Sequence, residues 1–170
     1  MDKTKETLIF DLSSNADVDN WRSIDDRIMG GMSESRVRFI EGVGMRFSGV
    51  VSLANNGGFA SIRSASKPYD LSVFSEIKLR VCGDGNTYKL SLRTDRFFDG
   101  ISYQMAFLTT NQWQDITLPF SKFIPTHHGT TLSSAAPLNP AKVQSFGLFI
   151  ADQQAGSFQL DVAWIKAALE

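Results

Sequence analysis

Apolar and polar residues alternate over many short segments of the chain. The apolar residues that recur at a spacing of two are Ile77, Leu79 and Val81; Tyr88, Leu90 and Leu92; Tyr103, Met105 and Phe107; Phe146, Leu148 and Ile150; and Phe158, Leu160, Val162 and Trp164. Successive side chains of a β-strand point to opposite faces, so this period is typical of strands with one face in a core. The pattern predicts an all-β protein and places Trp164 among its core residues.

Segments rich in turn-forming residues separate the predicted strands. These segments lie at 55–58, 83–86, 99–100, 111–112 and 155–156. Many short strands at such intervals predict a β-sandwich of the jelly-roll type. Short helical turns are expected at 16–21, 120–123 and 139–143. Residues 124–140 are expected to form the longest irregular stretch, and a loop of that length is often functional.

Composition narrows the class of protein. The chain has 170 residues, 42% of them hydrophobic, which is enough for one domain spanning residues 1–170. The net charge of −1 argues against a general affinity for nucleic acids or anionic membranes, because both require a basic surplus. No apolar run reaches the roughly 18 residues of a membrane span. Without an apolar leader ahead of the first strand, the chain is expected to be cytoplasmic and prokaryotic.

The residues do not select a catalytic or cofactor site. A serine nucleophile lacks the Gly-x-Ser-x-Gly context, and Cys82 is the single cysteine. The adjacent His127 and His128 are expected to point to opposite faces of an extended chain, which disfavours a shared transition metal. The sequence therefore predicts no enzyme, no cofactor and no transition-metal site. A structural calcium ion stays open, with candidate oxygen ligands on Asp25, Asp26, Asp84, Asp95, Asp99 and Asp152.

The Gly83-Asp84-Gly85-Asn86 segment lies between two predicted strands. A phosphate-binding glycine loop requires a helix N-terminus after it, and none is predicted here. A β-turn is therefore the better interpretation.

The most unusual motif runs Asp-Asp-Arg-Ile-Met-Gly-Gly-Met-Ser over residues 25–33. One interpretation is a structured loop whose charges satisfy backbone groups. The other is a recognition loop, because binding residues concentrate on loops held by a rigid scaffold. We expect the loop to be ordered and to pack near Gly57-Gly58-Phe59. Its candidate binding residues are Asp26, Arg27, Met29, Gly30, Gly31 and Ser33.

A second candidate is a polar sheet surface. Lys89, Ser91 and Arg93 alternate with core residues of one strand, and Gln104 alternates with those of the next. Arg93 and Gln104 share one face if these strands pair in register. Such a face either binds a polar ligand or a protein segment, or is simply solvated.

Several motifs in a specific order resemble the complex I intermediate-associated protein 30 family. They are Trp21 followed by 26–33, then 47–49, 56–63, 83–88, 102–104, Trp113, 118–123 and 156–160. The resemblance implies a jelly roll similar to galactose-binding domains and a role as an assembly chaperone, which in eukaryotes serves respiratory complex I in mitochondria. It implies no catalytic residues. Arg63 and Tyr103 lie in these motifs and complete the candidate binding set.

Three functions follow as hypotheses. The leading one is a non-enzymatic module that binds a protein partner during assembly of a complex. A carbohydrate-binding module is the alternative, with Trp21, Trp113 and Trp164 as the available tryptophans. The third is an enzyme acting on a small molecule, which would need a deep pocket around Arg93.

Overall fold

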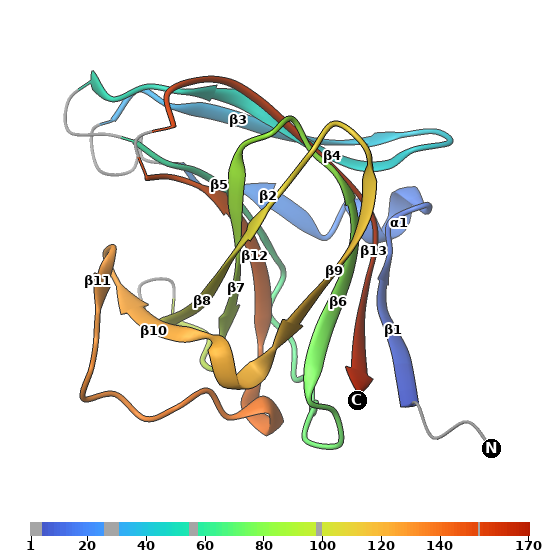
Figure 1. Cartoon of the computed structure of the whole chain (residues 1–170), viewed down its shortest axis with the longest axis vertical. Helices are drawn as coiled ribbons and strands as arrows, with labels where there is room; N and C mark the ends of the chain where they lie inside the picture. The colour runs from blue at the N-terminus through green and yellow to red at the C-terminus, as the bar shows by residue number, and fades with distance from the viewer. Residues whose placement is uncertain (1–4, 26–30, 55–57, 98–99, 153) are drawn as a thin grey trace.

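The protein is an all-β jelly-roll sandwich, 55% strand and 7% helix, as the alternation predicts. The computed structural model describes residues 5–25, 31–54, 58–97, 100–152 and 154–170. Within this part of the chain, the strands form two antiparallel sheets that pack face to face (Figure 1).

The first sheet has six strands among the described residues. In spatial order it contains β3 (Glu34–Ile40), β4 (Gly44–Val51), β13 (Gly156–Leu169), β6 (Glu76–Cys82) and β9 (Trp113–Pro119), with β1 (Lys5–Asp11) paired to β13. Because β13 is long, its first half pairs with β4 and its second half with β1.

The second sheet has seven strands among the same residues. In spatial order they are β11 (Thr130–Thr131), β10 (Ile124–His127), β8 (Ser102–Leu108), β7 (Thr87–Arg93), β12 (Ser145–Ile150), β5 (Ala60–Ser64) and β2 (Trp21–Ser23). The structure describes three short helices in full, α1 (Asn15–Val18), η3 (Phe120–Lys122) and η4 (Pro140–Lys142). They overlap the three predicted helical turns, although the turn predicted at 16–21 is helical only to Val18 and Trp21 begins β2.

The core lies between the two inner faces and is rich in aromatic side chains. Phe47 and Phe158 of the first sheet meet with ring centroids 4.9 Å apart, and Tyr88 of the second sheet lies 6.4 Å from each of them. All three side chains are buried. Edge-to-face packing of this kind adds to the stabilisation from apolar burial. The predicted inward faces of β6, β7 and β12 are confirmed.

The prediction that Trp164 enters the core is wrong. Val162 pairs with Val81, but Trp164 pairs with Arg80, so one extra residue lies on β13 between them. This β-bulge reverses the alternation that follows it. Ile165 is buried in its place, and Trp164 faces outward with the Lys166 Nζ 4.2 Å from its ring centroid.

The expected loop at 124–140 is only partly irregular. Its first residues form β10 and β11, which pair as a hairpin next to β8. The prediction for the two histidines also fails, because His128 adopts a positive φ of 49° at the hairpin turn. The imidazoles of His127 and His128 therefore stack, with centroids 4.1 Å apart, instead of pointing to opposite faces.

The segment Gly83–Asn86 crosses from β6 in one sheet to β7 in the other, so it is an inter-sheet connection and not a hairpin turn. The Asp84 carboxylate accepts the Tyr88 hydroxyl at 3.0 Å and the backbone N–H of Gln159 at 2.8 Å. Burial, and secondarily the Asp84 charge, raises the pKa of the Tyr88 phenol. This motif anchors the two sheets to each other.

Candidate functional site

The outward side of the seven-stranded sheet carries a continuous polar surface. Register places one row of directly opposite residues across six strands, from β2 to β10: Arg22, Arg63, Gly147, Ser91, Gln104 and Ile124. At about 4.8 Å between strands, this row is roughly 24 Å long. We call this side of the sheet the polar face and define it as Arg22, Ser61, Arg63, Lys89, Ser91, Arg93, Ser102, Gln104, Ser145, Gly147 and Phe149. Arg22 is exposed, Ser102, Ser145 and Gly147 are buried, and the other members are half-buried.

The prediction that Arg93 and Gln104 share a face is confirmed. Arg93 lies opposite Ser102, and Gln104 lies opposite Ser91, on neighbouring antiparallel strands. The Arg93 Nη1 donates to the carbonyl of Gly100 at 2.9 Å, which fixes the guanidinium near the start of β8. The Gln104 Nε2 donates to the Ser102 hydroxyl at 3.2 Å.

Arginines stand at one end of the central row. Arg22 is exposed and lies directly opposite Arg63, with both side chains on the outward side of the sheet. The pair places two guanidinium groups next to each other at this end of the row.

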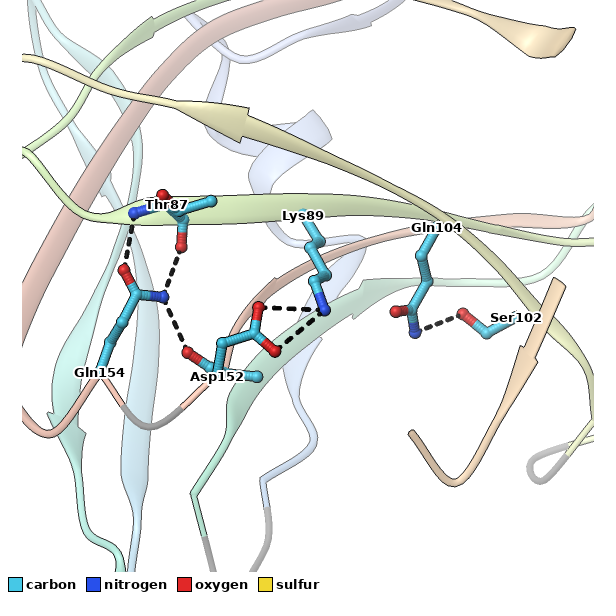
Figure 2. A network of polar contacts seen from close by, with 7 residues as sticks. Thr87, Lys89, Ser102, Gln104, Asp152 and Gln154 are labelled. Carbon is cyan, nitrogen blue, oxygen red and sulfur yellow. Dashed lines mark hydrogen bonds and ion pairs between the residues drawn. The ribbon is translucent and has the colours of Figure 1, made fainter. Parts of the chain in front are cut away.

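The border of the polar face is held by the turn between β12 and β13 (Figure 2). The Lys89 Nζ pairs with the Asp152 carboxylate at 3.2 Å. The Gln154 side chain accepts the Thr87 N–H and donates to the Thr87 carbonyl, both at 2.8 Å. The pairing of β12 with β7 ends at Lys89, and the Gln154 side chain forms the two hydrogen bonds to Thr87 that a longer β12 would form. The turn is therefore bonded to the first residue of β7.

An aromatic pair lies at the same end of the face as Lys89. Phe149 is directly opposite Lys89, and its ring packs edge-to-face on Phe59 with centroids 5.7 Å apart. Both rings are half-buried. The two rings form an apolar patch at this end of the polar face.

Asp25, the first residue of the unusual motif, satisfies backbone groups. Its carboxylate accepts the N–H of Ser35 at 2.8 Å and the N–H of Ser61 at 3.0 Å, which joins β3 to β5 across the two sheets. It also accepts the Ser35 hydroxyl at 2.6 Å. A cavity of about 290 Å³ opens beside it, lined by Asp25, Glu34, Ser35, Arg36, Gly49 and Val50.

The predicted binding residues fall into three groups. Arg63, Arg93 and Gln104 come together on the polar face. Gly31, Ser33 and Tyr103 lie elsewhere and are buried. Asp26, Arg27, Met29 and Gly30 lie outside the described residues, as does Gly57 of the segment expected beside them.

The buried candidates have structural contacts. The Ser33 hydroxyl accepts the Ser52 N–H at 2.9 Å and donates to the Ser52 carbonyl at 3.2 Å. Tyr103 points to the opposite side of β8 from Gln104, and its hydroxyl donates to the carbonyl of Ala136 at 3.0 Å. The Ser33 bonds hold the segment before β3 to the segment after β4, and the Tyr103 bond holds β8 to the segment after β11.

Sequence reasoning missed Arg22, Gly147 and Phe149 on the polar face. Gly147 and Phe149 alternate with the buried residues of β12, so their outward direction was readable from the pattern. Arg22 follows the buried Trp21 in a strand of three residues, which is too short for a period to be recognised.

In the described part of the chain, no three histidine, cysteine or acidic side chains gather as metal ligands. A search of the same residues finds no helix long and apolar enough to cross a membrane.

Solved structures with a similar fold include carbohydrate-binding modules and a part of an agarase. The family 11 module of the cellulase Lic26A-Cel5E from Clostridium thermocellum matches with a TM-score of 0.71 and 20% identity, covering 96% of this chain and 94% of that one. The family 30 module of Cel9D-Cel44B from the same organism matches with a TM-score of 0.63 and 14% identity, with 98% of both chains covered. At these identities the likeness defines the fold alone.

The family follows from sequence. The model of complex I intermediate-associated protein 30 matches residues 10–162, and the chain belongs to this family. The mitochondrial protein of that name from Mus musculus is 28% identical over 93% of this chain and 55% of its own length. The Drosophila melanogaster protein is 26% identical over 93% of this chain and 61% of its own length. The chain thus spans little more than half of these relatives.

Proposed function

We propose that this chain is a non-enzymatic binding module that holds a protein partner on its polar face during the assembly of a multisubunit complex. The observation that carries the proposal is the row of outward side chains from Arg22 to Gln104, aligned by register across five neighbouring strands. Arginine is enriched where interfaces bind tightly, because its planar guanidinium forms several directed hydrogen bonds. The names of the relatives associate this family with respiratory complex I, and the same kind of partner is proposed here.

A glycan is the second candidate ligand. Two observations favour it: the likeness in fold to carbohydrate-binding modules and the aromatic pair Phe59–Phe149 beside Lys89 and Asp152. Apolar rings next to hydrogen-bonding side chains suit a sugar, which has an apolar face and hydroxyl edges. Against this candidate, the two rings pack on each other, which leaves less flat ring area for a ligand.

Affinity capture from the native host tests the proposal. The polar-face variant carries Arg22→Ala and Gln104→Ala. The matched control, Arg38→Ala with Gln159→Ala, removes the same side-chain types from exposed outward positions of the other sheet. We expect one set of stoichiometric proteins with the wild type and the control, and a loss of this set with the polar-face variant.

A glycan assay separates the two candidates. Purified protein is applied to immobilised β-glucans, and the retained fraction is compared between wild type and a Phe149→Ala variant. If the β-glucans retain the wild type but not the Phe149→Ala variant, and affinity capture recovers no protein, the ligand of this face is a glycan and the proposal of a protein partner is wrong.

A further inference from the structure

The second half of β8 is a sheet edge without a neighbouring strand. Pairing with β10 covers only residues 102–104 of β8, whereas pairing with β7 continues to Leu108. Among the described residues no strand lies beside Ala106 and Leu108 on the side away from β7. Both residues are exposed, Leu108 to 72%.

The backbone N–H and C=O groups of these two residues lie in the plane of the sheet and point away from β7. The N–H of Thr109 donates to the carbonyl of Asn86, on the β7 side. Successive residues of a strand direct their hydrogen-bonding groups to opposite edges, so Met105 and Phe107 face β7 while Ala106 and Leu108 face away. The bonds between Thr87 and Gln154 agree, because Thr87 lies opposite Leu108 and directs its own groups away from β8.

This edge lacks the protection that other edges of the molecule have. Proteins guard exposed strands with charges or proline, because an unguarded edge pairs with other chains. The outer strand β3 carries Glu34, Arg36 and Arg38, and the outer strand β9 carries Asp115 and Pro119. In contrast, residues 101–110 contain neither a charged residue nor a proline.

We propose that an extended, uncharged segment of the protein partner adds a strand to the seven-stranded sheet along Ala106 and Leu108. Four backbone groups, the N–H and C=O of each residue, are placed to form the ladder. The added strand continues the line of β10, so its outward side chains lie next to the polar face at Lys89 and Gln104. The inference rests on the proposed protein partner and names how part of that partner is recognised.

A flexible segment fits this edge better than a second copy of the chain. If two copies paired β8 with β8 so that Ala106 lay opposite Leu108 of the second copy, Gln104 would lie opposite Thr110 of that copy. Ile124 of β10 already occupies the position beside Gln104. A peptide can leave the sheet at this point, whereas a folded second copy would collide with β10.

Residue-specific amide exchange, followed by nuclear magnetic resonance, tests the proposal on the full chain. The probe is the peptide Thr-Val-Thr-Val-Thr-Val-Thr with blocked termini, and the control is the same peptide N-methylated at every residue. Without peptide, we expect the amides of Ala106 and Leu108 to exchange at least tenfold faster than those of Met105 and Phe107. The probe should slow the two outward amides at least tenfold, and the N-methylated peptide should not.

Two variants check the site. Ala106→Pro removes an outward N–H without removing a bond to β7, so it should abolish the protection of Leu108 by the probe. If Ala106→Pro does not fold, Leu108→Lys introduces a guarding charge and should weaken the protection at least tenfold. The variant Arg38→Ala/Gln159→Ala, on the other sheet, should keep full protection. The probe assay needs no captured partner, so failure of the edge and failure of the polar face are distinguishable.

The proposal is overturned if the amides of Ala106 and Leu108 exchange as slowly as those of Met105 and Phe107 in the free protein. It is also overturned if the probe slows the exchange of neither outward amide. Protection of these two amides that grows with protein concentration, without peptide, would assign the edge to a second copy instead.

Discussion

Gly147 and Ser91 lie directly opposite each other at the centre of the polar face, so close that a Cβ on Gly147 would sit 2.4 Å from the Ser91 Oγ. Because glycine has no side chain, nothing projects from the sheet at position 147, between Arg63 and Ser91 in the central row. Gly147→Ala should force the Ser91 side chain out of its rotamer and lower the free energy of unfolding by about 0.5–1.5 kcal/mol. Urea denaturation measures the change.

A second substitution provides the control for Gly147. Ser91→Ala removes the obstructing oxygen, and the Ser91 Cβ itself would be 3.8 Å from the new methyl group. The double variant Ser91→Ala/Gly147→Ala should therefore be more stable than the sum of the single changes. Strict additivity would show that the two residues do not obstruct each other.

Gly49 faces a different obstacle, and the expected loss of stability is larger. A Cβ on Gly49 would meet the carbonyl oxygen of Glu34 at 2.0 Å, which is backbone and cannot rotate away. Gly49→Ala should cost about 1–3 kcal/mol of unfolding free energy, because β3 must separate from β4. A urea midpoint within error of the wild type would contradict the close approach of these strands.

Asp25 joins the two sheets through backbone hydrogen bonds. Asp25→Ala leaves the half-buried N–H groups of Ser35 and Ser61 without their acceptor. Two such unsatisfied donors should together cost about 1–3 kcal/mol. The comparison variant is Asp115→Ala, which breaks an exposed ion pair with Arg80 and should cost roughly 0.2–1 kcal/mol. Equal losses in thermal or urea unfolding would contradict the role assigned to Asp25.

Alkaline pH should destabilise the fold through two phenols, the half-buried Tyr69 and the buried Tyr88. Burial, and secondarily the charge of Asp17, raises the pKa of Tyr69 to about 12, above the value of about 10 in an unfolded chain. The folded state therefore holds this proton more tightly. Its contribution to stability is complete below pH 10 and is lost as the pH rises from 10 to 12. Tyr88 shifts in the same direction.

The matched experiment is urea denaturation of the wild type and Tyr69→Phe between pH 9 and 12. The wild-type midpoint should fall more steeply over the upper part of this range than the midpoint of the variant. Identical slopes would show that Tyr69 does not titrate with a raised pKa.

Much of this fold was readable from local pattern. The inward residues of β7 and the shared face of Arg93 and Gln104 follow from a period of two, because neighbouring strands that pair in register keep like faces together. The outward position of Trp164 was not readable, because the bulge before it depends on how β13 pairs with β6. A local alternation cannot report a register shift that a distant strand imposes.

The polar face was only half predictable for the same reason. Arg22 and Gly147 join the row through the strand order β2–β5–β12–β7, which brings together segments far apart in the chain. The stacking of His127 and His128 arises from a positive φ at the hairpin turn, which the strand pattern does not encode. Residues that act together on a sheet are found from the strand order, and the strand order is a property of the whole fold.

The affinity of the captured partner for matched variants tests the central claim most directly. The partner recovered with the wild-type chain is purified and titrated calorimetrically into wild type, Arg22→Ala/Gln104→Ala and Arg38→Ala/Gln159→Ala. The control should melt close to the wild type, since exposed substitutions usually change stability by less than about 0.5 kcal/mol. The polar-face variant should lose somewhat more, about 0.5–1.5 kcal/mol, because the half-buried Gln104 donates to Ser102; titration below its melting range keeps it folded. The polar-face variant should bind at least about tenfold more weakly, the effect of losing about 1.4 kcal/mol of binding energy, and the control should bind like the wild type. Unchanged affinity of the polar-face variant, with weaker binding by the control, would place the partner on the opposite sheet and contradict the account.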